Sequence, residues 1–330
     1  MQIRIAQYGI LHDHAYGKTR VIQENPDVDF VGIYEPDVRE KQKREDDSLY
    51  KNVHWFSSSA EMLEDEKIQA IAIQGRVGNN LDFAQKALKH NKHIWLDKPA
   101  GDNLKLFEQI LMMAREKNLL VQLGYMFRYN AGFQFLLDWA NSGKLGDIFS
   151  VRARISSGNV HEKNWERWNS NGERQGGIMF ILACHLIDII VSLMGRPDRV
   201  IPFLRHDGPK FDWFQDNNLV VFEYRDGQAV LESTALEISP SLSRRIEVYG
   251  TQGSIIIEPL EPPQLRLCLD TNRDGYKQGW QTVNVENRPR YVHSLTAFLE
   301  DIKKQKQPDR SLNHEYIVQE TVLRASGLEV

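Results

Sequence analysis

The sequence has few cysteines, no long apolar run and little net charge. Its 330 residues contain only Cys184 and Cys268, which are too few for a disulfide framework and therefore predict a reducing, cytoplasmic location. No apolar run approaches the roughly 20 residues that span a bilayer. The opening MQIRIAQYG also lacks the pattern of a signal peptide. We therefore expect a soluble protein and no membrane partner.

The charge balance excludes further classes of partner. Lys and Arg number 41 against 45 Asp and Glu, a formal net charge of -4, which gives no reason to expect binding to nucleic acid. Hydrophobic residues make up 41% and charged residues 26%, which are ordinary values for a globular protein. A chain of this length predicts two domains. Small polar molecules remain as expected partners.

Strands and helices alternate in the first third of the chain. Apolar runs with strand character occupy 3–6, 30–34, 68–73, 94–96 and 119–123. Helical spacing falls between them, at 18–24, 38–50, 60–63, 81–89 and 104–117. Because a parallel crossover needs a helix to return the chain, residues 1–123 are predicted to form a mostly parallel sheet with helices on both faces.

After Gly124 the pattern changes. Helical segments are expected at 133–141, 178–194, 291–305 and 314–323, and Gly195 should terminate the second of them. Residues 148–155 alternate like a strand, and 200–281 contain four or more strands joined by turns. A second domain, 124–330, with a largely antiparallel sheet is therefore predicted.

The stretch 92–101, KHIWLDKPAG, ends a short apolar strand on a charged pair. Asp97 and Lys98 follow the strand, and Pro99 follows them. Ligands bind at the carboxyl ends of strands in open α/β sheets, so Lys98 is a candidate for chemistry. A lysine in a solvent-facing turn is the alternative.

The turn between the first strand and the first helix begins with Gly9. A dinucleotide fold has glycines here, so that the backbone approaches a pyrophosphate that the helix N-terminus binds. Leu11 occupies the place of a second glycine, so an ordinary turn is the alternative. Glu35, after the second strand, can bind both ribose hydroxyls and repel a 2′-phosphate, which favours NAD over NADP. A turn or helix-capping acid is its alternative role.

His185 and Asp188 lie three residues apart in an otherwise apolar helical stretch. A buried structural histidine is one explanation. The other is catalysis, because neutral imidazole can accept a hydroxyl proton near pH 7 during alcohol oxidation. A metal site is less favoured: no second histidine or cysteine has ligand spacing with a carboxylate, and His12-Asp13-His14 falls in the predicted phosphate turn.

Aromatic and basic residues gather in the long polar stretch 160–175. They are His161, Lys163, Trp165, Arg167 and Trp168. Aromatic faces beside hydrogen-bond donors hold sugars and polyols, so this stretch is a candidate substrate loop, with a packed surface loop as the alternative. Arg128 and Tyr129 form a similar candidate.

Seven segments, in this order, resemble the Gfo/Idh/MocA family (glucose-fructose oxidoreductase, inositol dehydrogenase, rhizopine catabolism). They are the Gly9 turn, 34–37, 92–99, Arg128-Tyr129, 142–146, Gly176-Gly177 with 185–188, and 249–253. The resemblance covers nearly the whole chain. It implies an N-terminal Rossmann domain, a C-terminal α+β domain whose open sheet often forms the interface of a homodimer or homotetramer, and a nicotinamide cofactor between the domains.

Residue roles follow from the same resemblance. Lys98 would lie beside the nicotinamide ribose and the substrate oxygen, and His185 would be the catalytic acid/base. The cofactor-binding positions would be Gly9, Ile10, Leu11, His14, Glu35, Gly75, Arg76, Asn80, Asp97 and Lys98. The substrate-binding positions would be Arg128, Tyr129, His161, Trp165, Arg167, Trp168 and Asp188.

The sequence departs from the family pattern at several positions. Asp97 replaces a glutamate, which keeps the charge. Ile181 stands four residues before His185, where inositol-dehydrogenase-like members have an aspartate. Gly75-Arg76 and Asn80 replace a Thr-Pro pair and a histidine.

The sequence thus predicts an NAD-dependent oxidoreductase that transfers a hydride between nicotinamide and a secondary alcohol of a sugar, cyclitol or sugar derivative. Two alternatives stay open. One is NAD-assisted glycoside cleavage with the cofactor retained. The other is a catalytically silent nucleotide or sugar sensor, which Ile181 and Leu11 would favour.

Overall fold

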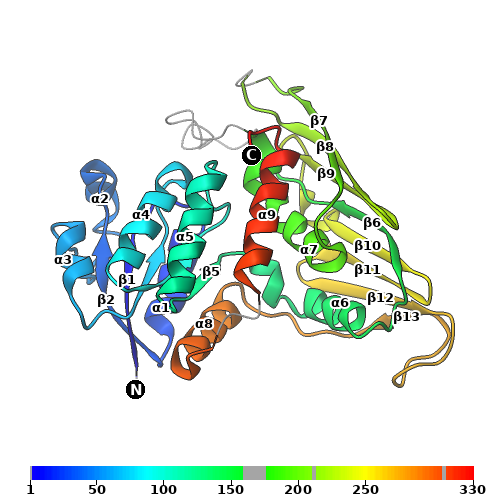
Figure 1. Cartoon of the computed structure of the whole chain (residues 1–330), viewed down its shortest axis with the longest axis horizontal. Helices are drawn as coiled ribbons and strands as arrows, with labels where there is room; N and C mark the ends of the chain where they lie inside the picture. Colours follow the sequence, from blue (N-terminus) through cyan, green and yellow to red (C-terminus); the bar gives the residue numbers. More distant parts are fainter. Residues whose placement is uncertain (1, 159–175, 210–212, 307–309) are drawn as a thin grey trace. The chain divides into compact units, whose positions relative to one another are not determined.

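The computed structural model describes residues 2–158, 176–209, 213–306 and 310–330, which form two compact units (Figure 1). One unit comprises Met1–Tyr125 and Pro289–Tyr316, and the other comprises Met126–Arg288 and Ile317–Val330. The candidates His161, Lys163, Trp165, Arg167 and Trp168 lie outside the described residues. Within the described ranges, no helix has the length and apolar character that crossing a membrane requires.

The first unit is built on a parallel sheet of five strands in the order β2-β1-β3-β4-β5. The strands are β1 (Ile3–Tyr8), β2 (Val28–Tyr34), β3 (Ala70–Ile73), β4 (His93–Leu96) and β5 (Val121–Leu123). The helices between them are α1 (Ala15–Glu24), α2 (Val38–Arg44), α3 (Ser59–Glu64), α4 (Val77–Lys89) and α5 (Leu104–Glu116). Since β2 and β3 flank β1 on opposite sides, the topological switch point lies at the carboxyl ends of β1 and β3.

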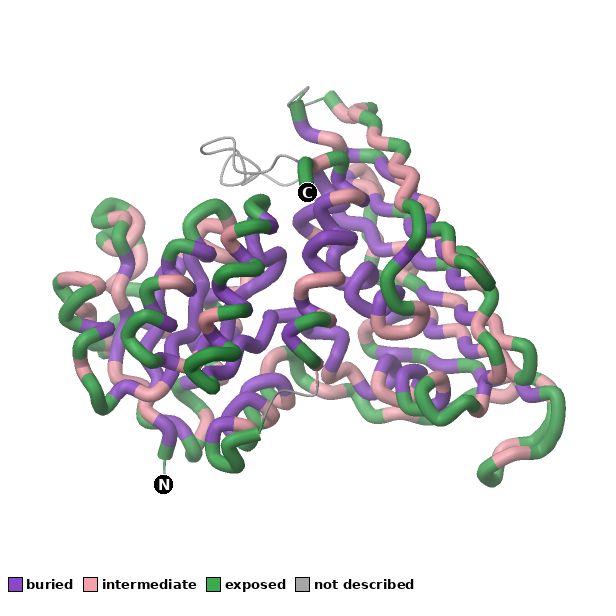
Figure 2. The backbone as a smooth tube through the Cα atoms, viewed as in Figure 1, coloured by how far each residue is buried: buried purple, intermediate pink, exposed green. Residues whose placement is uncertain are grey.

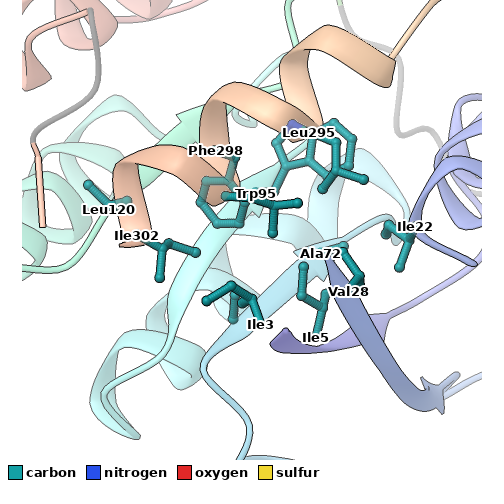
Figure 3. Close-up of a cluster of buried hydrophobic side chains, with 12 residues drawn as sticks. Ile3, Ile5, Ile22, Val28, Ala72, Trp95, Leu120, Leu295, Phe298 and Ile302 are labelled. Atoms are coloured by element: carbon teal, nitrogen blue, oxygen red, sulfur yellow. The ribbon is translucent and has the colours of Figure 1, made fainter. Parts of the chain in front are cut away.

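Helices cover both faces of this sheet (Figure 1). Successive strand residues point to opposite faces: Tyr8 stacks on Phe83 of α4, while Gln7 accepts a hydrogen bond from Thr19 of α1. The α1 face is completed by α8 (Val292–Lys304), which comes from far along the chain. Figure 3 shows this apolar cluster, where Trp95 of β4 packs against Phe298 of α8 with ring centroids 6.5 Å apart.

The second unit is built on an eight-stranded sheet in the order β13-β12-β11-β10-β6-β9-β8-β7, antiparallel except between β6 and β9. Its strands are β6 (Ile148–Arg154), β7 (Arg199–Arg205), β8 (Asn217–Tyr224), β9 (Gly227–Thr234), β10 (Arg245–Gly250), β11 (Gly253–Leu260), β12 (Pro263–Leu269) and β13 (Gly279–Val283). The strands bury alternate residues, as in β8.

Helices α6 (Ala131–Asn141) and α7 (Cys184–Met194) pack on one face of the larger sheet. None of the α-helices that the structure describes covers the opposite face, whose strands carry exposed and half-buried positions (Figure 2). The helix α9 (Leu312–Ala325) begins among residues of the first unit and ends among those of the second.

The architecture confirms the predicted fold class, a parallel Rossmann sheet followed by a mostly antiparallel sheet. Two predicted helices differ. Residues 38–50 form only the short α2, which buries no residue and so has no packing to extend it. The stretch 178–194 is not one regular α-helix, because Met179–Ala183 forms a π-helical turn before α7. As predicted, Gly195 follows the end of α7, at φ 77°.

Candidate active site

Gly9 brings the turn after β1 into contact with the turn after β3. Its backbone has φ +85°, and its N–H donates to the Tyr34 carbonyl at 2.8 Å. A Cβ on Gly9 would lie only 2.5 Å from the Cα of Gly75, a separation that real side chains do not reach. Two glycines are therefore needed at this switch point, because the two turns pack backbone against backbone.

Glu35 fastens the end of β2 to the same turn. Its side chain is buried, one carboxylate oxygen accepts from the Ile10 N–H at 2.7 Å, and the other accepts from the Asp37 N–H at 2.9 Å. Burial raises the pKa of Glu35, although both hydrogen bonds oppose that shift. A carboxylate has lone pairs beyond these two bonds, so the residue can hold the turn and also accept from a ribose.

The remaining cofactor candidates lie around this turn. Leu11 is half-buried and packs on the apolar cluster of Ile10, Ile33 and Tyr50. Arg76 lies at the start of α4 with Nη2 3.7 Å from an Asp37 carboxylate oxygen. Asn80 is fully buried, and its amide group has no hydrogen-bond partner among the described residues.

These residues fit a dinucleotide, the group that such a sheet implies. The Gly9 turn follows the first strand of the sheet, and Glu35 is the acid at the end of the second strand. Gln74 and Asn80 add buried amides with unmet hydrogen-bonding capacity, which is costly unless water or a ligand satisfies it. Leu11 does not supply the second glycine of the usual turn, since it serves apolar packing instead.

Asp97 lies at the centre of a buried polar cluster that the sequence did not reveal. Its carboxylate lies 3.0 Å from the His14 Nδ1 and 3.0 Å from the Lys18 Nζ. It also accepts from the N–H of Lys98 at 2.8 Å. The ring Nε2 of His12 lies 3.0 Å from the Lys98 carbonyl oxygen. The turn after β1 is thereby tied to the end of β4.

The partners of the two imidazoles indicate their tautomers. The Nδ1 of His12 accepts from the His14 N–H at 3.1 Å, so its Nε2 carries the hydrogen and donates to the Lys98 carbonyl. The Nδ1 of His14 faces the Asp97 carboxylate and donates to it. Burial lowers the pKa of His12 to about 3 and that of His14 to about 4, outweighing the attraction of Asp97. Both imidazoles are therefore neutral at physiological pH.

The charge on Asp97 is balanced by Lys18. Burial alone would raise the pKa of Asp97, but His12, Lys18 and His14 hold that pKa well below its usual range. Burial lowers the pKa of Lys18, and the adjacent carboxylate opposes that shift. The spacing of Lys18 four residues after His14 places these two side chains on one side of the first helix, but it does not link either of them to Asp97.

In the second unit, a buried ion pair lies next to His185. Arg128 donates from Nη2 to Asp188 at 2.6 Å and from Nε at 3.0 and 3.1 Å. Both residues are buried, and so is His185, whose ring lies against Phe127 with centroids 5.4 Å apart. The short 3-10 helix η1 (Met126–Tyr129) and α7 therefore bring together Arg128, predicted for substrate, with His185 and Asp188.

Comparison with known protein families identifies both units. Residues 9–125 match a model described as the NAD-binding Rossmann fold of an oxidoreductase family, and 140–324 match its C-terminal alpha/beta domain. The chain belongs to the Gfo/Idh/MocA oxidoreductase family. The resemblance inferred from the seven sequence segments is confirmed.

Relatives in this family are distant. The uncharacterized oxidoreductase YhhX of Escherichia coli (strain K12) is 26% identical over 221 residues, which cover 66% of this chain and 61% of YhhX. This chain thus spans about six tenths of the length of that relative. A myo-inositol 2-dehydrogenase of Thermotoga maritima is 20% identical over 284 residues, 82% of this chain and 80% of that protein.

Solved structures share the fold over nearly the full length. Levoglucosan dehydrogenase in complex with NADH and levoglucosan superposes with a TM-score of 0.82 at 14% identity, covering 99% of this chain and 98% of that one. An Agrobacterium radiobacter oxidoreductase in complex with NAD+, L-tartaric acid and magnesium gives a TM-score of 0.83 at 14% identity, covering 98% and 96%.

Proposed function

We propose that the protein is an NAD-dependent oxidoreductase that transfers a hydride between nicotinamide and a secondary alcohol of a sugar, cyclitol or sugar derivative. The observation that carries the proposal is the fixed position of Lys98. It follows β4 at the carboxyl edge of a Rossmann sheet, and hydrogen bonds hold both its N–H and its carbonyl. A lysine in an ordinary surface turn has no need of such support, and Lys98 is 95% buried (5% exposed).

Residues of the first unit would hold the dinucleotide. The Gly9 turn and the N-terminus of α1 suit the pyrophosphate, and Glu35 suits the ribose hydroxyls. Nicotinamide, when bound, accepts or supplies the hydride. The Glu35 carboxylate favours NAD. Arg76, 3.7 Å from Asp37, is the observation that favours the second candidate, NADP, because a nearby arginine can accommodate a 2′-phosphate.

Lys98 and His185 would carry the chemistry. The Lys98 ammonium polarises the substrate oxygen through its charge, and His185 exchanges the hydroxyl proton. Asp188, paired with Arg128, orients α7 around His185. Tyr129 and the candidates His161, Trp165, Arg167 and Trp168 would contact the substrate.

Relatives support the substrate class. A curated relative is named for myo-inositol, and a solved structure of the same fold holds levoglucosan. In this proposal the first unit, which includes 289–316, binds the cofactor, and the second unit binds the substrate. We further propose a cytoplasmic homodimer or homotetramer that pairs through the bare face of the larger sheet.

A catalytically silent sensor is the competing function. Ile181 is apolar and 8% exposed where inositol-dehydrogenase-like members carry an aspartate, and Leu11 packs on a core cluster rather than opening the phosphate turn. Such a protein would bind the dinucleotide or a sugar without turnover.

Titration with NADH and NADPH, monitored by nicotinamide fluorescence, tests the cofactor. A screen of sugars and cyclitols for absorbance change at the nicotinamide band then tests turnover. We expect NADH binding, activity in the parent, and at least a 100-fold loss in Lys98→Ala and His185→Ala, in line with about 10²–10⁴-fold for a positioned acid or base. Lys105→Ala, an exposed lysine on α5, is the matched control. Binding without turnover on any substrate would favour the sensor, and full activity in Lys98→Ala would refute the assignment.

A further inference from the structure

The cluster around Asp97 contains groups that the proposed chemistry does not use. We propose that Lys18 is the permanent counter-ion of Asp97, and that Lys18, Asp97 and His12 are positioning residues that lock the peptide of Lys98. The effect on catalysis rests on the proposed function. The effect on charge balance does not, because it follows from the buried groups themselves.

The buried ion pair is built into the packing on every side. Lys18 and Asp97 are both 0% exposed and 3.0 Å apart. The Lys18 ammonium lies 4.1 Å from the centroid of the Trp95 ring, which stabilises a cation further. Gly124 lines the pair, and a Cβ there would lie 2.7 Å from both the Asp97 carboxylate and the Lys18 ammonium. The space is therefore sized for these two charged groups.

The same carboxylate controls the backbone of Lys98. One Asp97 oxygen accepts from the Lys98 N–H and faces the His14 ring, and the His12 ring donates to the Lys98 carbonyl. The His12 donor is available only in the tautomer that the His14 N–H enforces. If the charge on Asp97 were not balanced by Lys18, an imidazole would have to take a proton, and this arrangement would change.

A metal ion is the competing occupant of the cluster. Donor atoms of His12, His14 and Asp97 lie within 4.8 Å of one another, a grouping compatible with a metal ion. The Lys18 ammonium already supplies a positive charge 3.0 Å from the carboxylate. A divalent ion beside Lys18 and Lys98 would meet repulsion from both. An internal ammonium therefore takes the role that a metal ion would have.

The charged and titratable groups around Asp97 define a test that needs no substrate. Lys18 faces it from α1, His12 and His14 from the turn, and Lys98 from its own segment. Two further groups lie nearby. The charge of Asp13 acts on His12, and the Tyr291 ring lies beside the His14 ring. With Lys18 removed, the two imidazoles, whose Nδ1 atoms lie 3.4 and 3.0 Å from the Asp97 carboxylate, are groups beside it that can gain a proton.

The first experiment follows the melting temperature of the full chain from about pH 5 to about pH 9, which spans the ordinary histidine pKa. In the parent, His12 and His14 should add no change of melting temperature above about pH 6.5, because both imidazoles are then neutral in the folded and in the unfolded chain. Lys18→Met should instead lose melting temperature as the pH rises through neutrality, because a protonated imidazole that pairs with Asp97 in the folded state is then lost. The double variant Lys18→Met/Asp97→Asn should regain the profile of the parent.

Equal profiles of melting temperature against pH for the parent and Lys18→Met would overturn the assignment of Lys18 as counter-ion. So would a stoichiometric amount of metal in the purified parent, measured by elemental analysis. If Lys18→Met does not fold, the double variant decides: recovery of the fold would support the counter-ion role, because the uncompensated carboxylate is gone, and failure to fold would overturn it.

The second experiment tests the lock on Lys98. His12→Leu removes the donor to the Lys98 carbonyl and should lower kcat by about 10–100-fold with KM for NADH nearly unchanged, as expected for a misplaced catalytic group. His12→Gln places an N–H near the same position and should restore most of the lost kcat. Equal losses in both variants, or a change confined to KM, would refute the lock. A parent that binds no NADH would refute the proposed function, while the melting profiles would still test the counter-ion.

Discussion

At the scale of single residues, Asp97 combines three tasks that the chain assigns to one carboxylate. It pairs with Lys18, accepts from the His14 ring and accepts from the Lys98 N–H. The resemblance to the family implied Asp97 as a cofactor-binding residue. It could not predict the pairing with Lys18, because that contact joins residues 79 positions apart and depends on how α1 packs against β4.

Asp97→Asn should therefore be strongly destabilising. The substitution leaves the buried Lys18 ammonium without its counter-charge, and breaking one side of a buried pair typically lowers the free energy of unfolding by about 3–5 kcal/mol. Urea unfolding at neutral pH would measure the loss. Asp102→Asn, at an exposed position a few residues on, should change stability by less than about 0.5 kcal/mol. Similar values for the two variants would contradict the buried ion pair.

The pair of Arg128 and Asp188 was half foreseen. Both residues were singled out, Asp188 because it shares a helix face with His185, but their bidentate contact spans 60 positions and left no local trace in the sequence.

Arg128→Lys should reveal whether the paired geometry matters for His185. Lysine keeps the charge but loses the planar fork that contacts both Asp188 oxygens. We expect a lower melting temperature and a kcat reduced by about 10-fold or more, because a displaced α7 also displaces His185. Arg199→Lys, at an exposed arginine of β7, is the control. If Arg128→Lys kept the kcat of the parent, the Arg128–Asp188 ion pair would have no role in the proposed reaction.

At the scale of elements, most strands and helices follow from the periodicity of apolar residues. The exception that bears on the site is the π-helical turn Met179–Ala183, directly before α7. Every residue from Ile178 to Ile181 is buried. No polar face therefore marks the place where the backbone hydrogen bonds change from the α-helical to the π-helical pattern. A uniformly apolar segment cannot show this shift, although such turns often occur near functional sites.

The end of α7 gives an element-scale prediction. Gly195 has φ 77° and ψ −156°, a backbone region that is essentially restricted to glycine. Gly195→Ala should lower the free energy of unfolding by about 1–3 kcal/mol, measured by urea denaturation. Gly78→Ala, at an exposed position inside α4, should be neutral or stabilising by up to about 1 kcal/mol. Loss of stability in both variants alike would contradict the backbone argument.

At the scale of the whole molecule, cofactor binding should appear as stability. A ligand at 100 times its Kd stabilises the folded state by about 2.7 kcal/mol, so NADH should raise the melting temperature by several degrees. Because Glu35 is fixed at the end of β2, NADPH should give a smaller increase. An equal or larger increase with NADPH would instead indicate that Arg76 binds the 2′-phosphate, and Arg76→Ala should then abolish the increase given by NADPH.

The first unit is made of two segments that are far apart in the chain, and this affects how the protein folds during synthesis. Residues 1–125 emerge first, yet the apolar face formed by Trp95 and its neighbours is covered by α8, which is synthesised only after the whole of 126–288. One face of the nascent Rossmann sheet therefore stays exposed to solvent until the strands of the second unit, residues 126–288, have been synthesised.

A fragment of residues 1–125 should accordingly be insoluble or bind chaperones, because bare apolar faces of incomplete folds aggregate. Adding residues 289–316 through a flexible linker should restore a soluble fold, measured by sedimentation and circular dichroism. A linked segment with Phe298→Asp should not. Synthesis of residues 289–316 thus sets the moment at which the nascent 1–125 unit can bury its apolar face and avoid aggregation.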